Sequence, residues 1–285
     1  MIAALRYEWT RLITLRSTWW ITGLAITVGA GFTFLVAMMI RIFTPSELTG
    51  EVNEDWSRFF LEAGMTQFSN VDPVFYLMAY AVAVLGILSW GHEYRHGMMR
   101  ATLTAVPNRT AVWAAKYITI AGFVAVAVIA SCVLSLIFTL IWFGGLDFQY
   151  DIGALLLALL KRVVYTVLLT WLVMSATVLI RHQTFSLVLL YLWPLGIETM
   201  VKLIALIFGG LMTNDGVTDA TRFLPFNAGG RIIQNFGIDD SGDGFQRNLD
   251  LFDNPLSAGG GLIVFGGFVV VLMIGSLVAF NKRDA

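Results

Sequence analysis

Charged residues are scarce in this chain of 285 residues. Only 13% of the residues are Asp, Glu, Lys or Arg, while 58% are hydrophobic, and about a quarter of an ordinary soluble domain is charged. An ordinary soluble fold is therefore excluded. The single cysteine, Cys132, excludes a disulfide within the chain. The chain also lacks the G-x-x-x-x-G-K-[ST] string of P-loop nucleotide sites.

The chain does contain six long apolar runs. A bilayer core about 30 Å thick needs about 20 apolar helical residues to cross it, and each run approaches or exceeds that length. The sequence predicts one transmembrane domain over residues 1–285, an all-α membrane protein with six transmembrane helices. Their expected ranges are 19–43, 73–90, 112–143, 152–180, 184–209 and 259–280.

The loops between these runs differ in charge sign. Residues 1–18 and 91–115 are basic, whereas residues 44–72 and 210–258 are acidic. Lys and Arg in short loops stay in the cytoplasm, so we expect both termini to be cytoplasmic and 210–258 to be an extracytoplasmic loop. Within 44–72 we expect a short helix resting on the bilayer, since this acidic loop also carries Trp56, Phe59, Phe60 and Leu61.

Residues 1–18 are expected to form an amphipathic helix before the first crossing. Apolar residues recur there at helical spacing, and Glu8 and several arginines face elsewhere. One interpretation is a helix in the membrane surface with its arginines toward anionic headgroups; the other is a positive-inside anchor for the first crossing. The expected membrane-surface residues are Arg6, Trp9, Arg11 and Arg16.

Charges also interrupt two of the apolar runs. Lys161 and Arg162 lie in the fourth run, and Glu198 and Lys202 lie in the fifth. Ionised groups in a membrane pair with one another or face water. Glu198 has a partner one turn away in Lys202, or reaches Lys161 or Arg162 on the other helix. One alternative is that these charges line a solute pathway. The other is that the fourth helix starts near Val163, so that the two basic residues snorkel to the outer interface.

One string suggests an enzyme. His92-Glu93-Tyr94-Arg95-His96 reads H-E-x-x-H, in which two histidines on one helix face bind zinc and the Glu is the general base. A catalytic zinc needs a third protein ligand, and the only other histidine is His182, in another loop. An intramembrane zinc metalloprotease with His92 and His96 as metal ligands is therefore the alternative function.

The same stretch carries another pattern, in the order Glu93, Gly97, Leu103, Pro107, Arg109 and Lys116. It resembles the first intracellular loop of ABC-2 type permeases, the membrane subunits of ABC exporters, although Met98 replaces the usual Thr. Leu179-Ile180-Arg181 and Arg222-Phe223-Leu224-Pro225 are similar to two later motifs of that family. The six helices and the amphipathic N-terminal helix also match its type V exporter fold, so the resemblance covers nearly the whole chain.

The resemblance implies that residues 91–115 form a coupling loop for an ATPase. Gly97 permits a sharp turn, residues 98–105 can form a short helix parallel to the membrane, and Pro107 ends it. Glu93 and Arg100 would be the charged contacts; alternatively, Glu93 pairs with Arg95, Arg100 or an N-terminal arginine and holds the loop. The implied coupling residues are Glu93, Tyr94, Arg95, Gly97, Arg100, Pro107, Arg109 and Lys116.

The resemblance also implies the partners. ATP and Mg would be bound by a separate ATPase subunit, so this chain itself is not expected to be an enzyme. A second copy or a paralogue would complete the pathway in the inner membrane of a prokaryote, among lipids and without nucleic acid. The substrate, the choice between homodimer and heterodimer, and the direction of transport stay open. A non-transporting membrane scaffold or immunity protein is the third hypothesis.

Overall fold

The computed structural model describes residues 2–43, 61, 63–67, 76–105, 108–143, 152–212, 219–234 and 256–282, and each regular element among them is helical. This confirms the predicted all-α class. In chain order the elements are α1 (Ile2–Thr14), α2 (Arg16–Phe43), α5 (Leu77–Arg95), α6 (Met99–Ala105), α7 (Arg109–Phe143), α8 (Ile152–Ile180), α9 (Gln183–Leu192), a π-helical segment (Trp193–Glu198), α10 (Thr199–Met212), a 3₁₀ turn (Thr221–Phe223), α12 (Pro225–Gln234) and α13 (Ala258–Lys282).

Five helical stretches in the described part of the chain are long and apolar enough to cross a membrane. They are Arg16–Ile42, Arg109–Phe143, Ile152–Ile180, Gln183–Phe208 and Ala258–Lys282. The chain is therefore a multi-pass membrane protein. α5 is not among the five because its last turn is polar, but its 19 residues extend about 28 Å at 1.5 Å per residue. That length is compatible with the second predicted crossing, residues 73–90.

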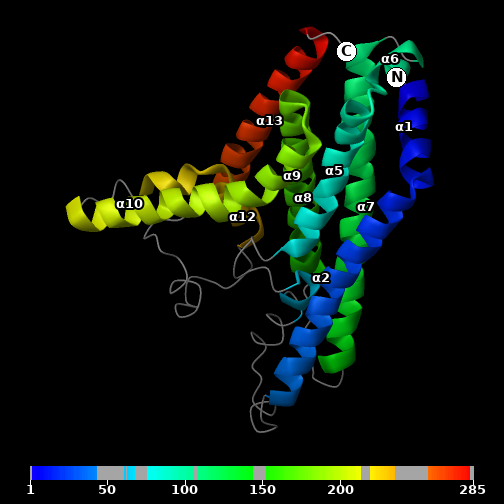
Figure 1. The fold of residues 1–285 in the computed structure, drawn as a ribbon. Helices are drawn as coiled ribbons and strands as arrows, with labels where there is room; N and C mark the ends of the chain where they lie inside the picture. The colour runs from blue at the N-terminus through cyan, green and yellow to red at the C-terminus, as the bar shows by residue number, and fades with distance from the viewer. Residues whose placement is uncertain are drawn as a thin grey trace.

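The long helices form a bundle in which α5 and α8 lie side by side (Figure 1). α2 and α7 pack against each other beside this pair, and α13 packs against the other side of α8. α5 is the most enclosed helix, and Met78, Val82 and Ile87 on it are completely buried. The outward faces of α2, α10 and α13 instead expose Leu, Ile and Val side chains, as expected of surfaces that contact lipid. α6, the start of α1 and the end of α13 lie at the same end of the bundle (Figure 1).

The fifth predicted crossing, residues 184–209, is bent. α9 ends at Leu192, and a π-helical segment with Pro194 as its second residue leads into α10. Proline removes a helix hydrogen bond and π-helical turns loosen the backbone spiral. α10 consequently leaves the bundle and lies across it, next to α12 (Figure 1). The two halves of this apolar run therefore point in different directions.

The described part of the first outside loop does not rest on the bilayer. Leu61, Met65 and Gln67 are buried, and the Gln67 side-chain amide donates to Ser131 Oγ at 2.7 Å. This segment therefore packs inside the bundle between α2 and α7, because the amide finds polar partners there that lipid would not supply. Trp56, Phe59 and Phe60 lie outside the described residues.

α1 is a helix, as the amphipathic pattern predicts, but it does not turn across the end of the bundle. It packs along α7 (Figure 1), and its buried residues are Ala4, Glu8 and Leu12. Glu8, which the pattern places away from the apolar face, is therefore on the protein-facing side. Of the four predicted membrane-surface residues, Arg6, Trp9 and Arg16 are exposed, whereas Arg11 is partly buried and pairs with Glu8 and Glu93.

Candidate functional site

The chain reverses sharply between α5 and α6, at the end of the bundle where α1 begins. Gly97 has a φ of +63°, which glycine adopts without strain. The Met98 N–H donates to the Glu93 carbonyl at 3.0 Å and the Gly97 N–H to the Tyr94 carbonyl at 3.5 Å. These two bonds close the end of α5 as a Schellman motif. The predicted turn at Gly97 is confirmed.

α6 is the predicted short helix, and it begins one residue later than expected, at Met99. Met99 and Thr102 on it are buried, whereas Arg100, Ala101 and Thr104 are exposed. The helix thus rests on the bundle with one face and offers the other outward. α7 then starts with an N-cap, because Asn108 Oδ1 accepts the Ala111 N–H at 3.1 Å. Pro107, the predicted end of the coupling helix, lies outside the described residues.

Four charged side chains meet beneath this turn, and we call them the charge quartet: Glu8, Arg11, Glu93 and Lys116. Lys116 Nζ lies 2.9 Å from the Glu8 carboxylate and 2.6 Å from the Glu93 carboxylate. Arg11 lies 3.3 Å from Glu8 and also pairs with Glu93. Each acid therefore contacts both bases, and the formal charges cancel.

Three members of the quartet are shielded from solvent, and the fourth, Arg11, is partly exposed. Glu93 and Lys116 are 1% exposed and Glu8 is 4% exposed. The Ser89 carbonyl accepts from Arg11 at 3.2 Å and from Lys116 at 3.4 Å, and the Trp90 ring lies 5.2 Å below the ammonium. Since the members come from α1, α5 and α7, the quartet fastens three helices at the root of α6.

Burial changes the interpretation of Glu93. A side chain that is 1% exposed does not reach a partner protein in this conformation, so Glu93 is not a direct charged contact here. It lies instead against Arg11, one of the N-terminal arginines offered as its alternative partner, and against Lys116. Sequence reasoning missed the Lys116 partner. Both Glu93 and Lys116 belong to the pattern that resembles the permease loop, but they are 23 residues apart in the sequence and no local rule predicts their contact.

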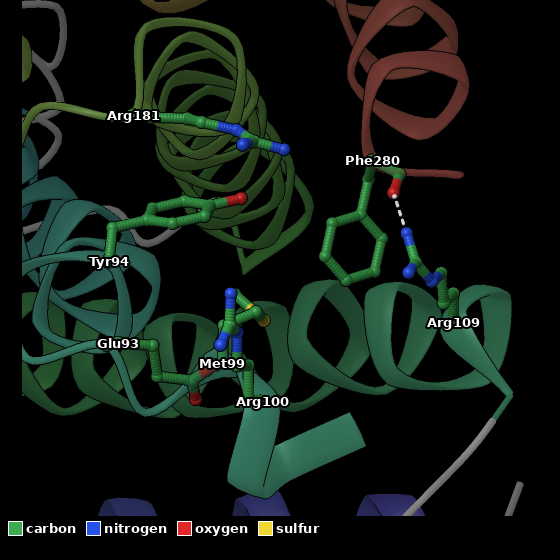
Figure 2. A pocket seen from close by; sticks show the side chains of 8 residues that line it. Glu93, Tyr94, Met99, Arg100, Arg109, Arg181 and Phe280 are labelled. Atoms are coloured by element: carbon green, nitrogen blue, oxygen red, sulfur yellow. Dashed lines mark hydrogen bonds between the residues drawn. The ribbon is translucent and has the colours of Figure 1, made fainter. Parts of the chain in front are cut away.

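A cavity of about 360 Å³ opens next to the quartet, between α6 and the ends of the long helices. Figure 2 shows Arg100 pointing from α6 toward Tyr94, with Arg181 beyond it. Arg109, the first residue of α7, reaches to α13 and donates to the Phe280 carbonyl at 3.2 Å. The cavity is lined by Glu93, Tyr94, Gly97, Met99, Arg100, Arg109, Arg181 and Phe280. It therefore unites five of the eight predicted coupling residues with two that were not predicted, Met99 and Phe280, and with Arg181 of the later motif.

Arg181 has an unusual backbone. Its φ is +57°, the left-handed region that costs a non-glycine residue about 1–2 kcal/mol. It stands directly after α8, a position at which glycine is usual. Its guanidinium lies 5.7 Å from the centre of the Tyr94 ring. An arginine at this position therefore brings a guanidinium group to the wall of the cavity, which a glycine would not do.

The H-E-x-x-H string extends past the end of a helix, since His92 lies in the last turn of α5 and His96 lies just beyond it. α5 ends at Arg95 and His96 is its C-cap, with the two imidazole rings stacked at 6.1 Å. Burial, His96 and the nearby Arg11 and Arg95 hold the pKa of His92 below its ordinary value. Glu93, which would be the general base, pairs with two cations. In the described residues, no group of three or more His, Cys, Asp or Glu side chains is arranged to hold a metal ion.

Glu198 has backbone partners that the sequence did not suggest. Its two carboxylate oxygens accept the backbone N–H groups of Phe226 and Asn227, at 2.8 and 2.9 Å. Glu198 thereby caps the start of α12, where a carboxylate also suits the helix dipole. Lys202, one turn further along α10, is partly exposed.

Arg162 does not snorkel to the interface. α8 starts at Ile152, ten residues before it, and the arginine is fully buried with its guanidinium 4.9 Å from the centre of the Tyr76 ring. Lys161, the preceding residue, is partly exposed. Two of the four intramembrane charges are thus buried: Glu198 caps α12, and Arg162 lies in the core on α8.

Comparison with known proteins finds no protein-family model and no curated protein that matches this chain.

Proposed function

We propose that this chain is a permease subunit of an ATP-driven transporter of the ABC-2 kind, and that a separate ATPase subunit acts on it through α6. The observation that carries the proposal is the placement of α6. This short helix lies at the end of the bundle with Arg100, Ala101 and Thr104 exposed, and it is joined to α5 by the turn at Gly97. It offers a soluble partner a surface that is fixed to the transmembrane helices.

The quartet connects this surface to three helices of the bundle, because its ion pairs join α5 to α1 and α7. Removing one partner of a buried ion pair costs about 3–5 kcal/mol, because the other charge is left unpaired in a dry environment. Moving α5 alone would separate Glu93 from Arg11 and Lys116. A push or pull on α6 is therefore expected to move α5, α7 and α1 together.

This joint motion is what a gate requires. Nucleotide binding at a remote ATPase would bias two arrangements of the bundle, and the helices fastened by the quartet would carry that bias across the membrane. A substrate pathway would form between this chain and a second permease subunit, either another copy or a paralogue. Export across the inner membrane of a prokaryote is the direction we propose.

The proposal is tested by what accompanies the chain out of its native membrane. After tagging and mild extraction, a P-loop ATPase should be recovered in near-equal amount and identified by mass spectrometry. Ala101→Trp adds bulk to the exposed face of α6 and should reduce that recovery about tenfold or more, since buried contacts at an interface centre commonly contribute 2 kcal/mol or more.

Ala220→Trp is the matched control, because Ala220 is exposed in the segment predicted to be extracytoplasmic. It should leave ATPase recovery unchanged. A wild-type chain that is recovered without an ATPase would contradict the proposal, and so would full recovery with Ala101→Trp.

A further inference from the structure

The stretch Gln183–Phe208 is bent, although its composition suits a straight crossing. Its 26 residues are apolar enough to span a membrane. As one continuous helix they would extend about 39 Å at 1.5 Å per residue, more than the bilayer core of about 30 Å. The bend lies in the π-helical segment Trp193–Glu198, which contains Pro194. The same residues therefore suit two shapes, a bent helix and a straight one.

The packing of α10 itself does not fix its direction. The elements that α10 contacts most are the π-helical segment and the 3₁₀ turn. From Thr199 to Phe208 only Ala205 is buried, and Leu203 and Ile207 are 51% and 52% exposed. A helix that is apolar all round suits lipid in any orientation. The junction with α9 and α12 must therefore hold α10 where Figure 1 shows it, beside α12.

Glu198, the last residue of the π-helical segment, provides this constraint. It is 2% exposed, and its carboxylate accepts the N–H groups of Phe226 and Asn227 at 2.8 and 2.9 Å. Pro225, the first residue of α12, has no N–H, and the side chain of Leu224 before it has no acceptor atom. α12 therefore takes the cap of its first turn from another helix.

α12 in turn is fixed to the bundle by close packing against α13. A Cβ added to Gly261 on α13 would lie 2.4 Å from the Ala228 carbonyl, and a Cβ added to Gly229 would lie 3.1 Å from the Phe265 ring. The two backbones approach closely because these positions carry no side chain. Glu198 thus ties the start of α10 to a helix that is itself held in the bundle.

We propose that Gln183–Phe208 is a two-state helix, and that the bond of Glu198 to α12 is the latch of its bent state. When the carboxylate leaves α12, the π-helical segment can rewind as α-helix and α10 can align with α9, because proline is tolerated within membrane-spanning helices. The released carboxylate then has Lys202 one turn along the same helix face.

The two states differ at the end of the bundle opposite α6. In the bent state α10 lies across the bundle (Figure 1), and in the straight state it continues α9 toward the far end. In the permease proposed above, this change would open or close the outer end of the pathway. The switch belongs to this chain alone and does not require an ATPase partner.

The test measures a distance in the purified full-length chain, held in nanodiscs of phosphatidylethanolamine and phosphatidylglycerol. In a Cys132→Ala background, nitroxide labels are attached to Phe208→Cys on α10 and Ile152→Cys at the start of α8, both at exposed positions. α8 and α9 pack against each other and run in opposite directions, so a straight α10 brings the two labels together. Pulsed electron paramagnetic resonance gives the ratio of short to long distances.

The wild type should show mainly the long distance. Glu198→Gln removes the charge and turns an amide group toward one of the two backbone donors, so the ratio of short to long distances should rise about tenfold. Pro194→Ala restores a hydrogen bond that only the straight helix can form and should raise the ratio in the same direction.

Asp219→Asn is the matched control. It removes another carboxylate just before the 3₁₀ turn, whereas the two N–H groups of α12 are held by Glu198. The distance distribution should equal that of the wild type.

Three results would overturn the latch. The first is a wild-type chain with mainly the short distance, because the bent state would then not be the resting one. The second is a ratio that neither Glu198→Gln nor Pro194→Ala changes, and the third is an equal rise with Asp219→Asn. If Glu198→Gln does not fold, Pro194→Ala decides, and an unchanged ratio overturns the proposal. Such a failure would leave the proposed function standing, since that test measures ATPase recovery through α6.

Discussion

At the scale of single residues, the quartet explains how four charges remain inside a chain with little charge. Burying an isolated ion costs free energy because its hydration is lost, and interactions with neighbouring charges and hydrogen-bonding groups must offset that cost. Lys116 has both carboxylates within 3 Å, at 2.9 and 2.6 Å, and Arg11 contacts the same two acids. The ring is neutral only as a set of four, so the loss of one member should be felt by the other three.

Lys116→Met tests this dependence. The substitution keeps much of the side-chain volume but leaves Glu8 and Glu93 with only Arg11, so we expect a loss of about 3–5 kcal/mol of stability, seen as a lower unfolding temperature in detergent. Glu93→Gln/Lys116→Met removes one charge of each sign and leaves the Glu8–Arg11 pair. The double variant should therefore be more stable than Lys116→Met alone, a coupling that a double-mutant cycle measures.

Lys282→Met provides the control, because Lys282 is exposed in the last turn of α13 and its loss should have little effect. If Lys116→Met unfolds at the same temperature as this control, the quartet does not fasten the three helices. Equal stability of the single and double variants would show that charge balance is unimportant there.

At the scale of elements, local sequence rules account for the turn and for α6, because their causes lie within a few residues. Glycine at a left-handed position and the two backbone bonds around it end α5, and a Schellman motif requires nothing from distant parts of the chain. The α1–α2 break was also foreseen within a few residues: α1 ends at Thr14 and α2 starts at Arg16.

Gly97→Ala isolates the contribution of this turn. An added Cβ would meet no atom within 4 Å, so the cost comes from the left-handed backbone alone, about 1 kcal/mol. For a chain of this size we expect the unfolding temperature to fall by about 2–4 °C. Gly122→Ala in α7 also meets no atom within 4 Å and lies in regular helix, so it should be neutral or stabilising. A fall of the same size in both variants would show that the turn is not the cause.

Other elements depend on contacts that no local pattern contains. The burial of Gln67 relies on Ser131 and Ser135 on α7, more than sixty residues away. The capping of α12 by Glu198 joins two segments that no local pattern connects, and the backbone N–H groups of Phe226 and Asn227 are partners that the sequence did not predict. Sequence patterns thus predict helix class and apolar length, whereas the partners of buried polar groups follow from the tertiary arrangement.

At the scale of the whole molecule, the arrangement of the helices determines which segments lie on the same side of the membrane. α6 and the end of α13 lie at one end of the bundle (Figure 1), where Arg109 at the start of α7 donates to the Phe280 carbonyl of α13. α8 runs from Ile152 toward Arg181 on that cavity, so its first residue lies at the opposite end. With the excess of Lys and Arg on the α6 side, the positive-inside rule predicts that α6 faces the cytoplasm.

Cysteine labelling tests this sidedness directly, because the chain has a single cysteine, Cys132, which is buried. In a Cys132→Ala background, Thr104→Cys on α6 and Asn281→Cys on α13 should react with a membrane-impermeant maleimide only after the cells are permeabilised. Ile152→Cys, at an exposed position that starts α8, should react in intact cells. If all three positions showed the reverse labelling pattern, the chain would have the opposite orientation and α6 would be out of reach of a cytoplasmic ATPase. That result would contradict the proposed function but not the fold. Labelling of Thr104→Cys and Asn281→Cys from different sides would contradict the bundle itself, since both positions then could not belong to the end at which the quartet and the cavity lie.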